Sequence, residues 1–215
     1  MKKIAVLISG QGRNLQAILD ACAEGRIAGK VVAVISDREE AAGLKKAAHA
    51  QVVSWAQYKH RETFCAALAD ALDAQRPDLV ACAGFMRVLT PQFTRSFEGR
   101  LLNIHPSLLP RHRGLHTHRA ALAAGDAQHG ASVHFVTAEL DGGPVLIQGR
   151  TPVRAGDTEA SLAERVMSEI ELKIYPQALS WLARGLLIWE AGVIRFKGRP
   201  LQVPLSLDDL EPAFR

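Results

Sequence analysis

The chain has 215 residues, with 26 lysines and arginines against 22 aspartates and glutamates, which gives a formal net charge of +4. Apolar residues make up 48% and charged residues 22%, a globular composition that excludes an intrinsically disordered chain. The length predicts one domain with a substantial core, and the small positive charge suits an anionic small substrate better than nucleic acid.

The cysteines and the hydropathy pattern indicate the cellular compartment in which the protein is expected. Cys22, Cys65 and Cys82 are widely spaced without a CxxC motif, so neither a disulfide framework nor a zinc site is indicated. We expect buried thiols in a reducing environment. The first apolar run is too short for a signal peptide, and no stretch reaches transmembrane length. The sequence therefore predicts a cytoplasmic protein.

The first half of the chain alternates apolar runs with amphipathic stretches. Strands that are apolar on both faces and separated by helices indicate a parallel sheet covered by helices on both sides. The right-handed crossover rule then predicts an α/β, Rossmann-like doubly wound fold. The expected strands are residues 4–8, 31–35, 52–55, 79–83 and 101–105, and the expected helices are residues 14–24, 41–50 and 60–74.

The second half changes character after a loop rich in His and Arg. We expect a short helix over 118–124, paired strands over 131–137 and 145–153, a long helix over 158–183, and a hairpin of 186–189 with 193–196. Residues 1–198 are predicted to form the single domain. Residues 199–215, with three prolines and several acidic residues, are expected to lie loosely on its surface.

A glycine-rich turn, Ser9 to Leu15, follows the first strand. Free backbone N–H groups and a helix dipole favour an anion here, and glycines let a phosphate approach the backbone closely. Arg13 adds a positive charge. Leu15 stands where the dinucleotide fingerprint requires a third glycine, and the P-loop Lys is absent. The alternative is a tight turn whose glycines serve only packing.

Two further segments carry groups suited to catalysis. Asn103 and His105 are two residues apart on a strand, so their side chains share a face. An amide donor beside an imidazole can stabilise an oxyanion and move protons. Asp141, followed by two glycines, can approach and orient such an imidazole. The alternatives are a structural histidine and an ordinary hairpin loop.

A histidine cluster lies between these segments: His112, His116 and His118, with His129 and His134 nearby. No carboxylate or cysteine stands at a recognisable ligand spacing, so a polar active-site rim or a helix entry is favoured over a metal site.

Together these segments resemble the glycinamide ribonucleotide transformylases, within the wider folate-dependent formyltransferases. The similarity runs from Ile4 to about Trp181. The Asn-x-His-Pro-Ser-Leu-Leu-Pro pattern belongs to the wider group, and the Ser-Gly-x-Gly turn and Gly-Leu-His-Thr-His segment narrow it. The matching segments are residues 7–16, 83–89, 101–110, 114–118, 130–136 and 140–144.

The resemblance implies roles for the matching residues. It places Asn103, His105 and Asp141 as the catalytic trio. The implied ribonucleotide contacts are Gly12, Arg13, Asn14 and Glu171, and the implied folate contacts are Arg61, Met86, Arg87, Val88, Leu89 and Asn103.

Three features depart from the family pattern. Arg13 stands in place of a serine, and His112-Arg113 replaces an aromatic residue and a proline. The helix before Tyr175 is one residue longer, and Leu172 replaces a histidine.

The implied reaction is formyl transfer from 10-formyltetrahydrofolate to the amine of glycinamide ribonucleotide. Asn103 and protonated His105 would stabilise the oxyanion, with Asp141 supporting His105. The folate is a co-substrate, and neither metal nor NAD is expected. The expected partners are these small molecules only, without nucleic acid or membrane, and the expected state is a monomer or weak homodimer.

Four alternatives stay open. A nicotinamide dehydrogenase would use the glycine turn, with Asp37 on the ribose hydroxyls, although Leu15 argues against it. A methionyl-tRNA formyltransferase and a formyl-folate hydrolase are each expected to need a further domain. A non-catalytic folate-binding module would be expected to lack part of the trio.

Overall fold

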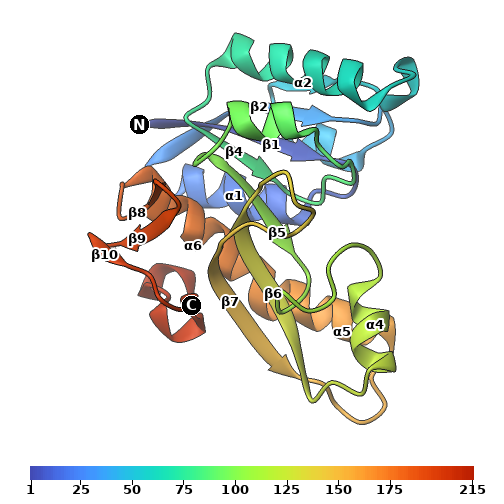
Figure 1. Cartoon of the computed structure of the whole chain (residues 1–215), viewed down its shortest axis with the longest axis vertical. Coiled ribbons are helices and arrows are strands. Elements are labelled where there is room, and N and C mark those ends of the chain that lie inside the picture. The colour runs from blue at the N-terminus through green and yellow to red at the C-terminus, as the bar shows by residue number, and fades with distance from the viewer.

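Seven strands form one sheet in the order β3-β2-β1-β4-β5-β6-β7 in the computed structural model, which describes residues 1–215 (Figure 1). β1 to β5 are parallel, whereas β6 and β7 run antiparallel to their neighbours. The chain order reverses between β1 and β4, so the predicted Rossmann-like arrangement is confirmed. The strands are β1 Lys2–Ile8, β2 Gly29–Ser36, β3 Ala50–Val52, β4 Leu79–Cys82, β5 Leu101–His105, β6 Gln128–Phe135 and β7 Val145–Pro152.

Helices cover both faces because the central strands are apolar on both. In β1, Ile4, Val6 and Ile8 pack on one side with α1 and α6, while Ala5 and Leu7 pack on the other with α2 and α3. In Figure 1, β6 and β7 run away from this half toward α4 and α5. The helices are α1 Arg13–Ala23, α2 Arg61–Gln75, α3 Pro91–Ser96, α4 Thr117–Ala123, α5 Glu159–Val166 and α6 Leu172–Ala183. None of them has the length and apolar character needed to cross a membrane.

The helix predicted over 158–183 is confirmed, with one irregularity. Thr158 caps it through a reciprocal pair with Ser161, and a π-helical turn, Met167–Glu171, separates α5 from α6. A π turn absorbs one extra residue without shifting the phase of the flanking helix. The turn lies in the stretch where the sequence predicts one extra residue, and Glu171 ends it. One turn further on, the hydroxyl of Tyr175 donates to the carbonyl oxygens of Cys82 and Leu102 under the sheet.

Two predicted elements differ near the sheet edge, and one short helix was not predicted. The third strand was expected over 52–55 but spans Ala50–Val52, and Trp55–Gln57 forms a 3₁₀ turn. The reason is that the N–H of Trp55 bonds to the carbonyl of Asp37, beyond the end of β2. The stretch 41–50 forms only a 3₁₀ turn, Ala42–Lys46. The short helix α3 was not predicted, although Thr90 caps it.

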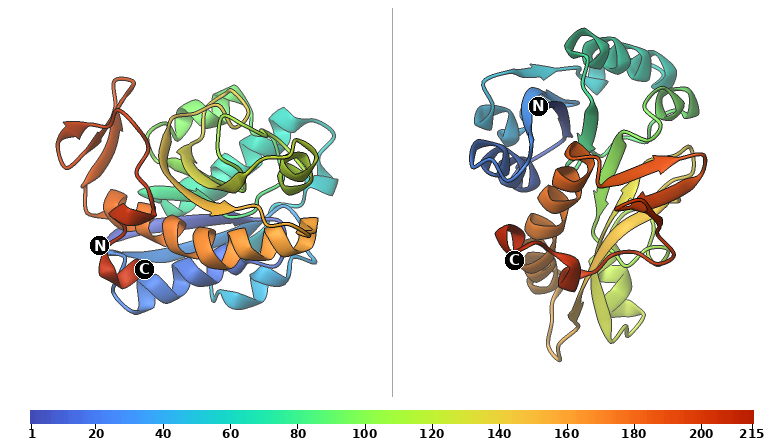
Figure 2. Two further views of the ribbon diagram at one scale, coloured as in Figure 1. Left: turned by 90° about the horizontal axis from the view of Figure 1, so that it is seen from below. Right: turned by 90° about the vertical axis from the view of Figure 1, so that its left-hand side faces the viewer.

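Residues 199–215 pack on the domain, so the expectation of a loose tail was wrong. β8 Leu187–Glu190, β9 Val193–Phe196 and β10 Arg199–Pro200 form a small antiparallel sheet. The chain then runs beside the edge strand β7, where the N–H of Leu205 donates to the carbonyl of Leu146 and Leu205 accepts from Gln148. Leu210 and Phe214 are buried in the main core. Figure 2 shows the hairpin projecting and the last residues returning to α6. An open sheet edge supplies the unpaired backbone groups that this segment satisfies.

Candidate active site

The carboxyl ends of β1, β4 and β5 bring the unusual segments of the sequence to one edge of the sheet. The N–H of Ser9 donates to the carbonyl of Gly84, and the Ser9 hydroxyl accepts from the N–H of Met86. The segment after β4 is thereby fastened to the glycine-rich turn after β1. Ligands of open α/β sheets bind at this kind of edge, beside the point where the strand order reverses.

Asn103, His105 and Asp141 come together at this edge. His105 Nδ1 lies 3.5 Å from Asp141 Oδ2, and both side chains are at least nine-tenths buried. On its other side, His105 Nε2 donates to the carbonyl of His112 over 2.9 Å. Both ring nitrogens thus face oxygen atoms.

The loop that carries Asp141 is held by the segment that follows β5. Asp141 has a left-handed backbone, with φ of 47°. Its Oδ2 accepts the N–H of Gly114 over 2.9 Å. Arg113 forms an ion pair with Glu139 across the same two loops. The departure from the family pattern at Arg113 therefore joins the two loops that enclose His105.

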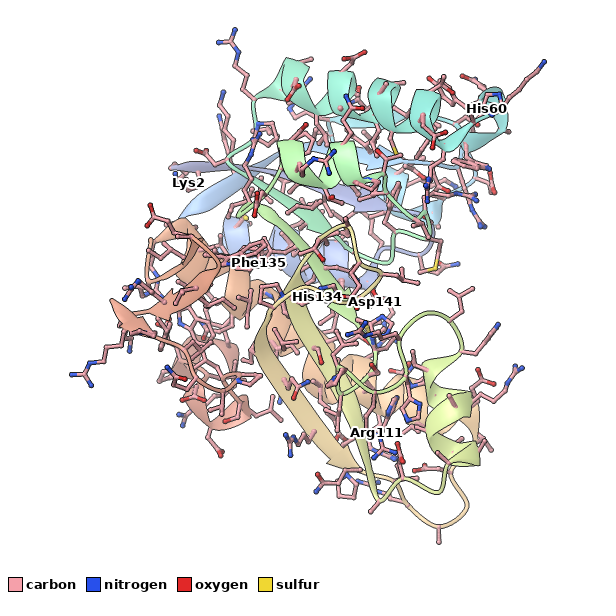
Figure 3. All side chains as sticks on the ribbon, viewed as in Figure 1. Lys2, His60, Arg111, His134, Phe135 and Asp141 are labelled. Carbon is pink, nitrogen blue, oxygen red and sulfur yellow. The ribbon has the colours of Figure 1, made fainter.

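His134 is a site residue that sequence reasoning did not single out. Its Nδ1 donates to the carbonyl of Phe135 over 2.8 Å, so Nε2 is left to accept from Asn103 Nδ2 at 3.2 Å. Burial lowers the pKa of His134, which keeps the ring neutral and able to accept. Figure 3 shows His134 beside Asp141, whose Oδ1 lies 3.8 Å from Nε2.

The position of His134 follows from the pairing of β5 with β6, in which Asn103 is opposite His134. The sequence predicted strands here but did not predict their register. A prediction of the register between β5 and β6 would have found this contact.

Three histidines of the predicted cluster, His112, His118 and His129, take part in hydrogen-bonded pairs, whereas the His116 side chain makes no hydrogen bond. His112 Nε2 lies 2.7 Å from Asp126 Oδ2, and His129 Nε2 lies 3.1 Å from His118 Nδ1. Burial and the neighbouring histidines lower the pKa of His129 to about 4. No three His, Cys, Asp or Glu side chains come together in an arrangement that could hold a metal ion. The cluster is a polar wall below His105.

The glycine-rich turn and the π turn meet at the other end of the site. Gly12 precedes α1 with φ of 71°, and a Cβ there would lie 2.9 Å from the Cα of Gly43. Asn14 Nδ2 donates to Glu171 Oε2 over 2.8 Å, and burial raises the pKa of the Glu171 carboxyl. Arg13 pairs with Glu164 of α5. The four residues predicted to contact the ribonucleotide are therefore adjacent.

The predicted folate segment, residues 86–89, is an extended loop after β4. Met86 and Val88 are half-exposed, whereas Leu89 is buried. Arg87 is held by Asp37, with 2.5 Å between Nε and Oδ2, and it lies over the ring of Trp55. The Asp37 side chain is fully buried in this pair. It is therefore not free to bind ribose hydroxyls, as the dehydrogenase alternative requires.

Arg61 does not join this segment. It begins α2, is exposed, and makes its one ion pair with the adjacent Glu62, at 3.8 Å. α2 does reach the segment through Phe64, whose ring stacks on Phe85. The structure thus brings together every predicted site residue except Arg61.

Comparison with known proteins decides between the remaining alternatives. A sequence model described as formyl transferase matches residues 2–179. The chain belongs to the formyl transferase family. Phosphoribosylglycinamide formyltransferase of Escherichia coli is 51% identical over 188 residues, covering 86% of this chain and 88% of the relative. That of Haemophilus influenzae is 42% identical over 205 residues, covering 94% and 96%.

Solved structures of this family have the same fold. Phosphoribosylglycinamide formyltransferase of Coxiella burnetii superposes with a TM-score of 0.90 at 42% identity, covering 95% of this chain and 98% of that one. Glycinamide ribonucleotide transformylase 1 of Symbiobacterium toebii gives 0.87 at 48% identity, covering 91% and 94%.

Proposed function

We propose that this formyl transferase moves the formyl group of 10-formyltetrahydrofolate to the amine of glycinamide ribonucleotide, a step of purine biosynthesis. One observation carries the proposal. Asn103, His105 and Asp141 meet at the same sheet edge as the glycine-rich turn and segment 86–89, in a chain 51% identical to an enzyme of that name.

In the first step, the glycinamide nitrogen attacks the formyl carbon. The carbonyl electron pair moves onto oxygen and forms a tetrahedral intermediate. Asn103 Nδ2 has two hydrogens, of which His134 accepts one. The second donates to the oxyanion, and protonated His105 donates as well once its Nε2 releases the carbonyl of His112. Such donors are effective because they are already oriented when charge develops.

In the second step, the intermediate expels the folate nitrogen. The oxyanion pair re-forms the carbonyl, the bond to the folate nitrogen breaks, and His105 supplies the proton that this nitrogen takes. The attacking nitrogen loses a proton, and this proton goes to His105 or to solvent. Asp141, at 3.5 Å from His105 Nδ1, orients the ring and favours its charged form during the transfer.

The substrates lie end to end. Gly12, Arg13, Asn14 and Glu171 hold the ribonucleotide, and residues 86–89 receive the pterin through their backbone. Holding the amine and the formyl carbon together supplies much of the rate. Arg61 contacts the folate only if its exposed side chain turns toward segment 86–89.

Release of the folate product, followed by absorbance, tests the proposal. It should require glycinamide ribonucleotide and should collapse in Asp141→Asn, while the exposed control Asp70→Asn on α2 keeps wild-type turnover. Release without the ribonucleotide would identify a hydrolase. No release under either condition would contradict the proposed substrates.

We infer that the enzyme works in the cytoplasm as a monomer or weak homodimer. The three cysteines are free, as expected in a reducing compartment. Sedimentation velocity over a range of concentrations tests the assembly state, and a stable higher oligomer would contradict it.

A further inference from the structure

Arg13 and Glu164 form an ion pair across the opening of the glycine-rich turn. Arg13 Nη1 and Nη2 donate to the two carboxylate oxygens of Glu164 over 2.5 and 2.8 Å, which is a bidentate pair. The two residues are 151 positions apart and join α1 to α5. The hydrogen bonds to Glu164 raise the pKa of Arg13.

This ion pair is easily exchanged. The Arg13 side chain is 41% exposed and that of Glu164 is 62% exposed. Pairs of this kind contribute little to stability, because water screens them and two long side chains lose freedom. A phosphate dianion offers the same fork-shaped acceptor with more charge, so it can displace the carboxylate.

Arg13 is placed to serve an anion bound at the turn. It is the first residue of α1, and side chains in a helix lean toward its N-terminus. The N–H groups of Arg13 and Asn14 have no acceptor within the chain. Asn14 is 6% exposed, and its Oδ1 is buried without a partner, as is typical of a site built for a ligand. Lys46 donates to the carbonyl of Gly12 and adds a second cation.

We propose that Arg13 leaves Glu164 when the ribonucleotide binds and pairs with its phosphate, so that Glu164 sets the affinity of the phosphate site by competing for the guanidinium. This inference rests on the proposed function for the identity of the substrate. The phosphate contact itself is independent of the chemistry at the formyl carbon.

Calorimetric titration with ribose 5-phosphate tests the contact without turnover. Arg13→Gln should weaken binding about tenfold, the loss of one charge-assisted pair. Arg13→Lys should retain part of the affinity, because Lys is a point charge without the fork. Glu164→Gln should tighten binding a few-fold, because the guanidinium is released.

The double variant Arg13→Gln/Glu164→Gln should bind like Arg13→Gln, since removing the Glu164 carboxylate has no effect once the guanidinium is gone. Glu159→Gln is the matched control. It removes an exposed carboxylate on the same helix, paired with Arg119 at 3.0 Å, and should leave binding unchanged. Wild-type affinity in Arg13→Gln, or in Glu164→Gln, would overturn the proposal, as would failure of the wild type to bind ribose 5-phosphate.

Steady-state kinetics separate this proposal from the proposed function. The effects should fall on KM for glycinamide ribonucleotide, because the phosphate contact is uniform binding that persists through the reaction. Normal turnover with unchanged KM in both single variants would refute the role of Arg13 and leave the function standing. If the wild type shows no turnover, the proposed function is wrong, while the titration still decides the contact.

Discussion

The amide of Asn103 owes its orientation to His134. Because His134 Nδ1 donates to a carbonyl, Nε2 can only accept, and the Asn103 amide must present its nitrogen there. Asn103→Ala should lower kcat about 10²–10³-fold, the usual loss for one oxyanion donor. His134→Phe should cause a smaller loss. The double variant should resemble Asn103→Ala, because His134 acts through the amide. Single-turnover kinetics measure all three, and additive losses would show that His134 acts separately.

The buried histidines make the folded state sensitive to acid. The pKa of His129 is 6.5 in the unfolded chain and falls to about 4 in the folded protein. The unfolded chain therefore binds more protons between these values, so stability falls as the pH is lowered from 7 to 4. His134, with its lowered pKa, adds to this fall.

The free energy of unfolding should change with pH by no more than about 1.4 kcal/mol per pH unit for each histidine. Urea unfolding at several pH values measures it. His129→Gln should flatten the slope, whereas His49→Gln, at an exposed position, should not. An equal slope in the His129 variant would assign the acid sensitivity to other groups.

Asp37 holds Arg87 of the predicted folate segment, residues 86–89. Asp37→Asn removes the charge that holds Arg87 and should cost about 2 kcal/mol, below the range for a fully buried pair because Arg87 is partly exposed. It should also raise KM for the folate more than KM for the ribonucleotide. Urea unfolding and steady-state kinetics test both effects, with Asp73→Asn on α2 as the exposed control.

At the scale of elements, we expect the π turn between α5 and α6 to behave as a removable insertion. Deleting the exposed Ser168 should convert the turn to regular α-helix without changing the phase on either side. The Asn14–Glu171 contact and turnover should survive. Deleting Ala163, within regular α5, should instead rotate its N-terminal part by about 100° and displace Leu162 from the core. Circular dichroism, thermal melting and turnover distinguish these outcomes. Unfolding by the Ser168 deletion would show that the turn is required.

At the scale of the whole molecule, the C-terminal segment covers the edge of β7. A chain that ends at Pro204 loses the backbone bonds of Leu205 and the burial of Leu210 and Phe214. Each large apolar side chain contributes about 1.5–3 kcal/mol when buried, so the loss should reach several kcal/mol. The freed edge should also promote association. Thermal melting and size-exclusion chromatography test this, and a shortened chain as stable and monodisperse as the full one would contradict it.

Most of the sheet could be predicted because its strands are continuous apolar runs, such as residues 4–8 and 79–83, which fit only a doubly covered parallel sheet. The proximity of Asn103, His105 and Asp141 was predictable from the family resemblance of their motifs, and the structure brings them together. Strand register was not, since it depends on packing across β5 and β6, and His134 was missed for that reason. The tail was missed because its three prolines suggested a loop, whereas single apolar residues anchor it.

The backbone at Asp141 restricts what selection or a mutant library can place there. With φ of 47°, this position favours Asp, Asn or Gly and penalises other side chains by about 1–2 kcal/mol. Glutamate keeps the charge yet pays this conformational penalty, and asparagine loses the charge while fitting the turn. Saturation mutagenesis at this codon should therefore recover well-folded but inactive clones for asparagine and glycine, and no charge-conserving substitute. We therefore expect the backbone geometry and the proposed role of the charge to favour aspartate at this position independently of each other.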